Sequence, residues 1–211
     1  MDHELLDEHE REDMVRKWIK ENVPVLIVGA SLGLAGVFGW RYYQEHLATH
    51  RQQAAAEYAH LAEKDSKMDP AHLETEYADT PYAALAAMAA AKSDLSDKSL
   101  DEAVVGYRKT VKLATNPGLK LLAKVRLSKL LTASGKPGEA LKVLHEVGEP
   151  TGFVGLINEM KGDAYQAQGD RDQAIEAYRQ ALATLDPASG NRRNVEMKLE
   201  DLGVPSNGVS G

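Results

Sequence analysis

The stretch from Gly162 to Ala181 reads GDAYQAQGDRDQAIEAYRQA and carries most of the information about the fold. Its small residues and its two tyrosines are spaced as in a pair of amphipathic helices that meet at a turn around Gly169. Gly162 and Ala174 would let the two helices cross closely, and the tyrosine rings would fill the space beside the crossing. The stretch therefore predicts an antiparallel helical hairpin.

This hairpin recurs upstream with a fixed period. Four pairs of matching residues lie 34 positions apart: Gly135 and Gly169, Ala140 and Ala174, Leu144 and Tyr178, and Val147 and Ala181. A helix-turn-helix period of 34 residues is typical of the tetratricopeptide repeat. A more divergent first unit keeps only Ala103 and Tyr107. We expect a solenoid of two to three repeats that is capped by a helix over 191–202.

Composition and charge place the whole chain in the all-α class. Ala, Leu, Glu, Lys and Gln abound, and no β-branched run alternates between apolar and polar residues. The net charge of −7 leaves no basic surplus to hold nucleic acid. Helices are predicted at 71–78, from Pro81 onward, and at 99–114, 119–132, 137–146, 152–167, 170–184 and 191–202; Ser99 and Glu102 form a capping box at the start of the third.

An uncharged run from Asn22 to Trp40 occurs once, near the start of the chain. As a helix it would cover roughly 28 Å, about the thickness of one hydrocarbon core. A buried helix of a soluble protein is one alternative, and a cleaved signal peptide is another. The segment before the run is long and acidic for a signal peptide, and the passable exit at 37–39 is followed at once by Trp40 and by two tyrosines that suit a membrane interface. We therefore expect a retained transmembrane helix at 23–40.

Basic residues around this run predict its orientation. Four precede it (Arg11, Arg16, Lys17 and Lys20) and two follow it (Arg41 and Arg51). The positive-inside rule then places the N-terminus in the cytoplasm and the repeats across the membrane. The chain would thus divide into a cytoplasmic tail (1–22), the span (23–40), a juxtamembrane stalk helix (41–68), a tetratricopeptide-like periplasmic domain (69–202) and a flexible tail (203–211).

No residue pattern indicates catalysis, a cofactor or a metal site. His46 and His50 are spaced to share a metal ion, but no third ligand accompanies them. The pair Gly135-Lys136 lacks the upstream Gly and the Ser or Thr of a phosphate loop. We therefore predict that the protein is not an enzyme and binds no cofactor.

Two surfaces are candidates for protein contacts. Gly29, Gly33 and Gly36 share one face of the predicted span and would allow close helix packing in lipid, although Gly is common in membrane helices in any case. Repeat register predicts a groove along the first helices of two repeats, where the inner positions line a shared surface. Its residues are Leu122, Val125, Lys129, Thr132, Glu159, Asp163 and Gln166. So short a solenoid could instead fill its own groove.

The order of these elements, together with the sequences Gly39-Trp-Arg-Tyr42, Tyr82-Ala-Ala-Leu-Ala86 and Gly162-Asp-Ala-Tyr165, resembles the YfgM family. The resemblance covers nearly the whole chain, from about Val15 to Leu202. It implies an ancillary subunit of the SecYEG translocon in the bacterial inner membrane, with the repeats in the periplasm. Members associate with the membrane-anchored chaperone PpiD and pass emerging client polypeptides to periplasmic chaperones. The alternative function is a tetratricopeptide scaffold of another inner-membrane envelope assembly.

Overall fold

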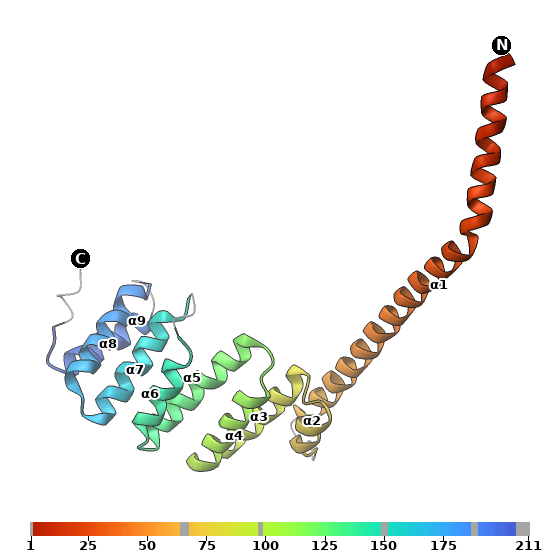
Figure 1. Cartoon of the computed structure of the whole chain (residues 1–211). Helices are drawn as coiled ribbons and strands as arrows, with labels where there is room; N and C mark the ends of the chain where they lie inside the picture. Colours follow the sequence, from red (N-terminus) through yellow and green to blue (C-terminus); the bar gives the residue numbers. More distant parts are fainter. Residues whose placement is uncertain (1, 64–67, 97–98, 149–151, 187–189, 206–211) are drawn as a thin grey trace. The chain divides into compact units, whose positions relative to one another are not determined.

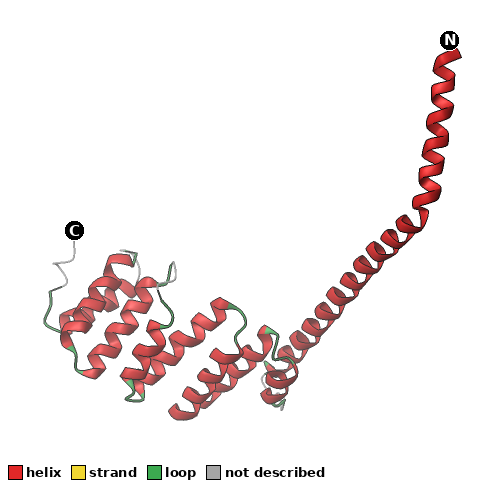
Figure 2. Cartoon of the chain, viewed as in Figure 1, coloured by secondary structure: helices red, strands yellow, loops and turns green. Residues whose placement is uncertain are grey.

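A computed structural model describes residues 2–63, 68–96, 99–148, 152–186 and 190–205 of the chain. Within these ranges the secondary structure is helical, in nine helices, and contains no strand (Figure 2). The chain divides into two compact units, Met1–Gln52 and Gln53–Gly211. The expectation of an all-α protein is confirmed for the described residues.

The first unit consists of helix α1 (Asp2–Leu61) as far as Gln52. Helix thus begins at Asp2, inside the segment expected to be a cytoplasmic tail. Large apolar side chains along the run at 23–40 are exposed, including Val25, Leu32 and Phe38. None of the described helices is by itself long and apolar enough to cross a membrane; two parts of α1, Glu12–Val25 and Ile27–Leu61, meet the length and composition requirements only as a pair bent by 46°. Pro24 lies beside the bend, and proline is a common cause of helix kinks.

The second unit contains the last turns of α1 and eight further helices. In Figure 1, α3 to α9 stack as successive antiparallel helices, with α2 at one end of the stack and α9 at the other. Their bounds are α2 Pro70–Glu76, α3 Pro81–Ser96, α4 Leu100–Leu113, α5 Pro117–Ala133, α6 Pro137–His145, α7 Val154–Gln168, α8 Arg171–Thr184 and α9 Gly190–Asp201. The pairs α3–α4, α5–α6 and α7–α8 are the three hairpins of the repeat pattern, and the predicted helices lie within a few residues of the observed ones.

Local sequence explains where most of these helices begin and end. Asn116 and Asp170 are the N-caps of α5 and α8, and their side chains accept hydrogen bonds from the backbone N–H groups of Leu119 and Gln173. The turns inside the last two hairpins place Gly135 at φ 74° and Gly169 at φ 85°, a conformation that glycine adopts without strain. The 34-residue spacing of these two glycines therefore reflects two equivalent turns.

The capping box predicted at Ser99 and Glu102 is wrong. Ser99 precedes α4, but its side chain makes no capping hydrogen bond. In a capping box the backbone N–H of Ser99 would donate a hydrogen bond to the Glu102 carboxylate. It donates instead to the carbonyl oxygen of Asp94 at 3.0 Å. This hydrogen bond between the end of α3 and the residue before α4 replaces the box.

The predicted flexible tail includes residues that finish α9. Gly203 has φ 73°, and the N–H of Val204 donates to the carbonyl oxygen of Leu199 at 3.0 Å. The side chain of Val204 packs against the core formed by α8 and α9. This is the glycine-terminated helix end known as the Schellman motif. Residues 206–211 of the predicted tail, 64–67 of the predicted stalk, and the prolines at 150 and 187 lie outside the described residues.

The core is built from the repeat positions. Ala103, Tyr107 and Ala140 are buried in the cluster that joins the first two hairpins. In the last hairpin Gly162 lies directly against Tyr178, so that a Cβ at position 162 would overlap the aromatic ring. The divergent first unit thus has the same architecture as the other two.

Candidate functional site

Helix α5 carries four of the seven predicted groove residues. Leu122 is 42% exposed and Lys129 is exposed, whereas Val125 is half-buried against the cluster of Leu144, Ile157 and Met160. Thr132 is also half-buried, and its hydroxyl donates to the carbonyl oxygen of Ser128 at 3.0 Å. The solvent-accessible part of this predicted surface is therefore Leu122 and Lys129.

One further residue on the same side of α5 was missed by the repeat register. Arg126 is exposed, and its Nη1 lies 3.3 Å from the sulfur of Met88 on α3. Arg126 follows Leu122 by four residues and precedes Lys129 by three, so the three side chains share one face. Helical spacing from Leu122 could have found it. We call Leu122, Arg126 and Lys129 the α5 face.

The three groove residues on α7 have a different environment, because a lysine of α9, which packs on α8, reaches two of them. The Nζ of Lys198 on α9 lies 2.8 Å from Oε1 of Glu159 and 2.7 Å from Oδ1 of Asp163. Glu159 is only 7% exposed, and Gln166 is exposed at the end of the helix. The carboxylates of this half of the predicted groove are thus already engaged within the chain.

Tyr178 on α8 completes this cluster. Its hydroxyl lies 2.7 Å from Oδ1 of Asp163 and 2.8 Å from Oε1 of Gln166, and Nζ of Lys198 lies 5.7 Å from the centre of its ring. Burial and the hydrogen bond to Asp163 hold the pKa of Tyr178 far above its usual value. Burial alone would lower the pKa of Lys198, but its hydrogen bonds to Asp163 and Glu159 outweigh burial and raise it. Lys198 is therefore fully charged at neutral pH and closes the end of the repeat stack.

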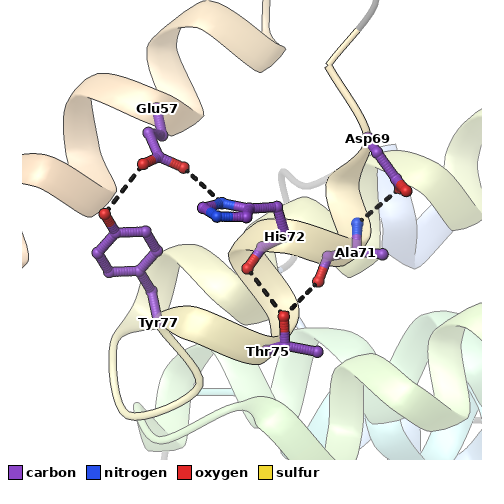
Figure 3. Close-up of polar contacts among 6 residues, drawn as sticks. All are labelled: Glu57, Asp69, Ala71, His72, Thr75 and Tyr77. Atoms are coloured by element: carbon purple, nitrogen blue, oxygen red, sulfur yellow. Dashed lines mark hydrogen bonds and ion pairs between the residues drawn. The ribbon is translucent and has the colours of Figure 1, made fainter.

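A second polar cluster lies at the opposite end of the stack, where the last turns of α1 pack on α2 (Figure 3). Glu57 lies 3.0 Å from Nδ1 of His72 and accepts a hydrogen bond from the hydroxyl of Tyr77 at 2.9 Å. The hydrogen bond that the Tyr77 hydroxyl donates to Glu57, together with burial, raises the pKa of Tyr77. Beneath these groups an apolar cluster includes Ala54 and Leu73. The last turns of α1 are thus part of the folded repeat domain, whereas the predicted domain began at residue 69 and a stalk folded alongside it was the alternative.

The glycines predicted to form a packing face in the span have open space around them among the described residues. A Cβ added at Gly29, Gly33 or Gly36 would meet nothing within 4 Å there. The packing of the described residues does not explain their small size.

No group of three His, Cys, Asp or Glu side chains that could hold a metal ion occurs among the described residues. His46 and His50 lie one helical turn apart on α1, in the first unit. On α5, two cations and a leucine are exposed on one face of the helix.

Comparison with known proteins assigns the chain to a family. The family described as tetratricopeptide repeat-like domain matches residues 16–204. The chain belongs to this family. The match spans all three hairpins, the capping helix and the apolar run of α1.

Three curated relatives are similar along almost their whole length. A Haemophilus influenzae protein is 29% identical over 204 residues, covering 93% of this chain and 98% of the relative. A protein of Escherichia coli is 24% identical over 204 residues (94% of this chain and 98% of the relative), and one of Neisseria gonorrhoeae is 28% identical over 205 residues (93% and 98%). All three are named ancillary SecYEG translocon subunit. The resemblance to a family of ancillary translocon subunits with tetratricopeptide-like repeats is confirmed.

Proposed function

We propose that this protein is a non-enzymatic adaptor that associates with the SecYEG translocon at the bacterial inner membrane. The observation that carries the proposal is the similarity over nearly the full chain to relatives named ancillary SecYEG translocon subunit, combined with the match of residues 16–204 to the tetratricopeptide repeat-like domain. Repeat solenoids of this kind are interaction domains, because their stacked helices expose extended surfaces.

The apolar run at 23–40 serves as the single membrane anchor in this proposal. Its side chains are exposed along α1, and lipid would cover that apolar surface. Trp40, Tyr42 and Tyr43 follow the run and suit the membrane interface. With more basic residues before the run than after it, the N-terminus lies in the cytoplasm and the repeats lie in the periplasm.

Gly29, Gly33 and Gly36 form the contact with a partner span. Glycines on one face let two helix backbones approach closely in lipid, where apolar burial gives no preference for helix pairs. The open space around these three residues supports this role, since no described residue of the chain lies within 4 Å of a Cβ placed there.

The anchored repeats act by mass action. Tethering at the translocon exit raises their local concentration beside emerging polypeptides, so a modest affinity for a chaperone such as PpiD or for a client is sufficient. The adaptor thereby links translocated proteins to periplasmic chaperones. No bond-making chemistry is needed, and the family is not a known class of enzyme.

Affinity purification of the full chain from native membranes in mild detergent tests the proposal. We expect SecYEG subunits to co-purify, and replacement of all three glycines by leucine to reduce their recovery while the circular dichroism of the helices is unchanged. Recovery of a different envelope assembly in place of SecYEG would show that the protein is a scaffold of that assembly.

Protease added outside intact spheroplasts should digest the chain after Arg41, and protection of that region would overturn the topology.

A further inference from the structure

Helix α5 differs in charge from the protein that contains it. The chain as a whole carries a net charge of −7, yet α5 holds four basic residues and no acidic residue. These are Lys120, Lys124, Arg126 and Lys129. The charge of α5 is thus opposite in sign to the net charge of the whole protein.

Several cations elsewhere in the repeat domain are paired with carboxylates. Arg108 pairs with Glu139, Lys109 with Glu74, and Lys136 with Asp101. On α5, Lys124 pairs with Glu146 at 3.1 Å. Across the described ranges Arg126 and Lys129 form no ion pair, and Arg126 contacts the sulfur of Met88.

The α5 face (Leu122, Arg126 and Lys129) combines these two cations with an exposed apolar side chain. The opposite face of α5 is buried in the core through Ala123, Leu127, Leu130 and Leu131. Packing within the domain therefore explains the buried face but not an exposed leucine beside two unpaired cations.

We propose that the α5 face docks an acidic segment of a protein partner, with an apolar side chain of that segment against Leu122 and its carboxylates on Arg126 and Lys129. The inference rests on the adaptor function proposed above and names the chemistry of what the repeats bind. Charge complementarity selects the occupant, because two unpaired cations in an acidic protein attract carboxylates and repel basic segments. An anionic membrane surface is a poorer match for the α5 face. Lipid-binding patches gather about four to eight basic residues, whereas this face presents two.

Helix α7 restricts this docking to α5. Residues Glu159 and Asp163 occupy the equivalent repeat positions and are already bound to Lys198. Their carboxylates would also repel an acidic segment that extended across them. The bound segment therefore lies along α5 and does not extend across α7.

Fluorescence anisotropy with the full chain in a neutral detergent tests the inference. The probes are three labelled synthetic peptides of one length, in which leucine alternates with glutamate, with glutamine or with lysine. We expect the glutamate peptide to bind and the other two not to bind. The double variant Arg126→Glu and Lys129→Glu should weaken the glutamate peptide by at least about tenfold, because two attractive pairs become repulsive, and Leu122→Gln should weaken it less.

A matched double variant controls for net charge. Lys112→Glu on α4 and Arg179→Glu on α8 make the same charge change at two exposed cations that form no ion pair within the described residues. This variant should bind the glutamate peptide as the wild type does. Equal loss in both double variants, or equal binding of all three peptides, would overturn the inference. So would binding of the wild type, but not of the α5 variant, to phosphatidylglycerol vesicles without any binding of the glutamate peptide.

The same variants separate this inference from the proposed function. Co-purification of SecYEG with a wild type that does not bind the glutamate peptide would refute the α5 docking and leave the adaptor function intact. Peptide binding through Arg126 and Lys129 without any SecYEG in the purified complex would do the reverse.

Discussion

The middle and last repeat units carry equivalent residues in different situations. Lys129 on α5 and Asp163 on α7 lie 34 positions apart and face the same side of the stack. Asp163 is bound by Lys198 and lies within hydrogen-bond distance of the Tyr178 hydroxyl, whereas Lys129 is exposed. The comparison teaches that repeat position alone does not decide whether a side chain is free to bind a partner, because a side chain of a later helix can supply the opposite charge.

The same contrast holds where the two helices of each unit cross. In the last unit Gly162 lies against the ring of Tyr178, while the middle unit has Ser128 and Leu144 at the matching positions. Ser128 is buried, and its hydroxyl donates to the carbonyl oxygen of Val125 at 2.8 Å. A small polar residue and a leucine thus make the crossing that glycine and tyrosine make in the last unit.

The largest expected effect breaks the crossing of the last unit. Gly162→Val places a branched side chain where even a Cβ would overlap the ring of Tyr178. We expect the free energy of unfolding to fall by about 3 kcal/mol, as strong overpacking of a core does, and Tm to fall by about 10 °C. Thermal unfolding of the full chain in detergent, followed by the circular dichroism of the helices, measures this change.

Gly138→Val provides the matched control for this test. A Cβ at Gly138 on α6 would lie 3.8 Å from the side-chain nitrogen of Gln168, which is ordinary contact. Its Tm should change by far less than that of Gly162→Val. Equal losses in the two variants would mean that helix propensity, and not the crossing, sets the stability.

A smaller effect is expected where α9 closes the last unit. Lys198→Met keeps the aliphatic stem but leaves the carboxylate of Glu159, which is 7% exposed, without its cation. We expect a loss of about 2 kcal/mol, the usual cost of a buried acceptor without a partner. If Tm is unchanged, the charges of this unit are as free as those of α5, and the comparison fails.

The pH dependence of this loss identifies its origin. Because the folded pKa of Lys198 is raised above the reference value of 10.5, its contribution to stability is complete below pH 10.5 and is lost as pH rises through the folded pKa. The difference in Tm between the wild type and Lys198→Met should therefore be constant across neutral pH and should shrink only in alkaline solution. A difference that already disappears near neutral pH would assign the effect to another group.

The smallest expected effect concerns the middle unit. Arg126→Gln and Lys129→Gln together remove two cations that form no ion pair within the described residues, so the free energy of unfolding should change by less than about 0.5 kcal/mol. Calorimetric or circular-dichroism Tm values close to the wild type would sharpen the contrast with Lys198. A loss as large as that of Lys198→Met would show that the α5 face stabilises the domain itself.

Much of the fold was predictable from local patterns. The 34-residue period located the hairpins, and proline or asparagine at 116–117 and glycine at 169 marked the helix ends. The capping box at Ser99 failed because its backbone N–H had a competing partner in Asp94, which lies in the preceding helix. Local motifs predict helix ends well only where no neighbouring segment takes the same hydrogen-bonding group.

The candidate site was predictable only in part. Repeat register placed Leu122 and Lys129 on one accessible side of α5, but it also assigned Glu159 and Asp163 to an open groove. Register describes the direction in which a side chain leaves its helix and contains no information about which side chain comes to meet it. The membrane span at 23–40 and the packing role of the three glycines stay predictions that the experiments above address.

By itself, then, the sequence determined the helical class, the repeat period and the close crossing at Gly162, because all three follow from spacings of a few residues along one chain. Only the tertiary structure decided which charges are neutralised. Lys198 and Glu159 are 39 residues apart in sequence and meet at 2.8 Å because α9 packs on α8, from where the Lys198 side chain reaches α7. The strength of an ion pair depends on the distance and burial of its two groups, and both are set by how distant helices pack.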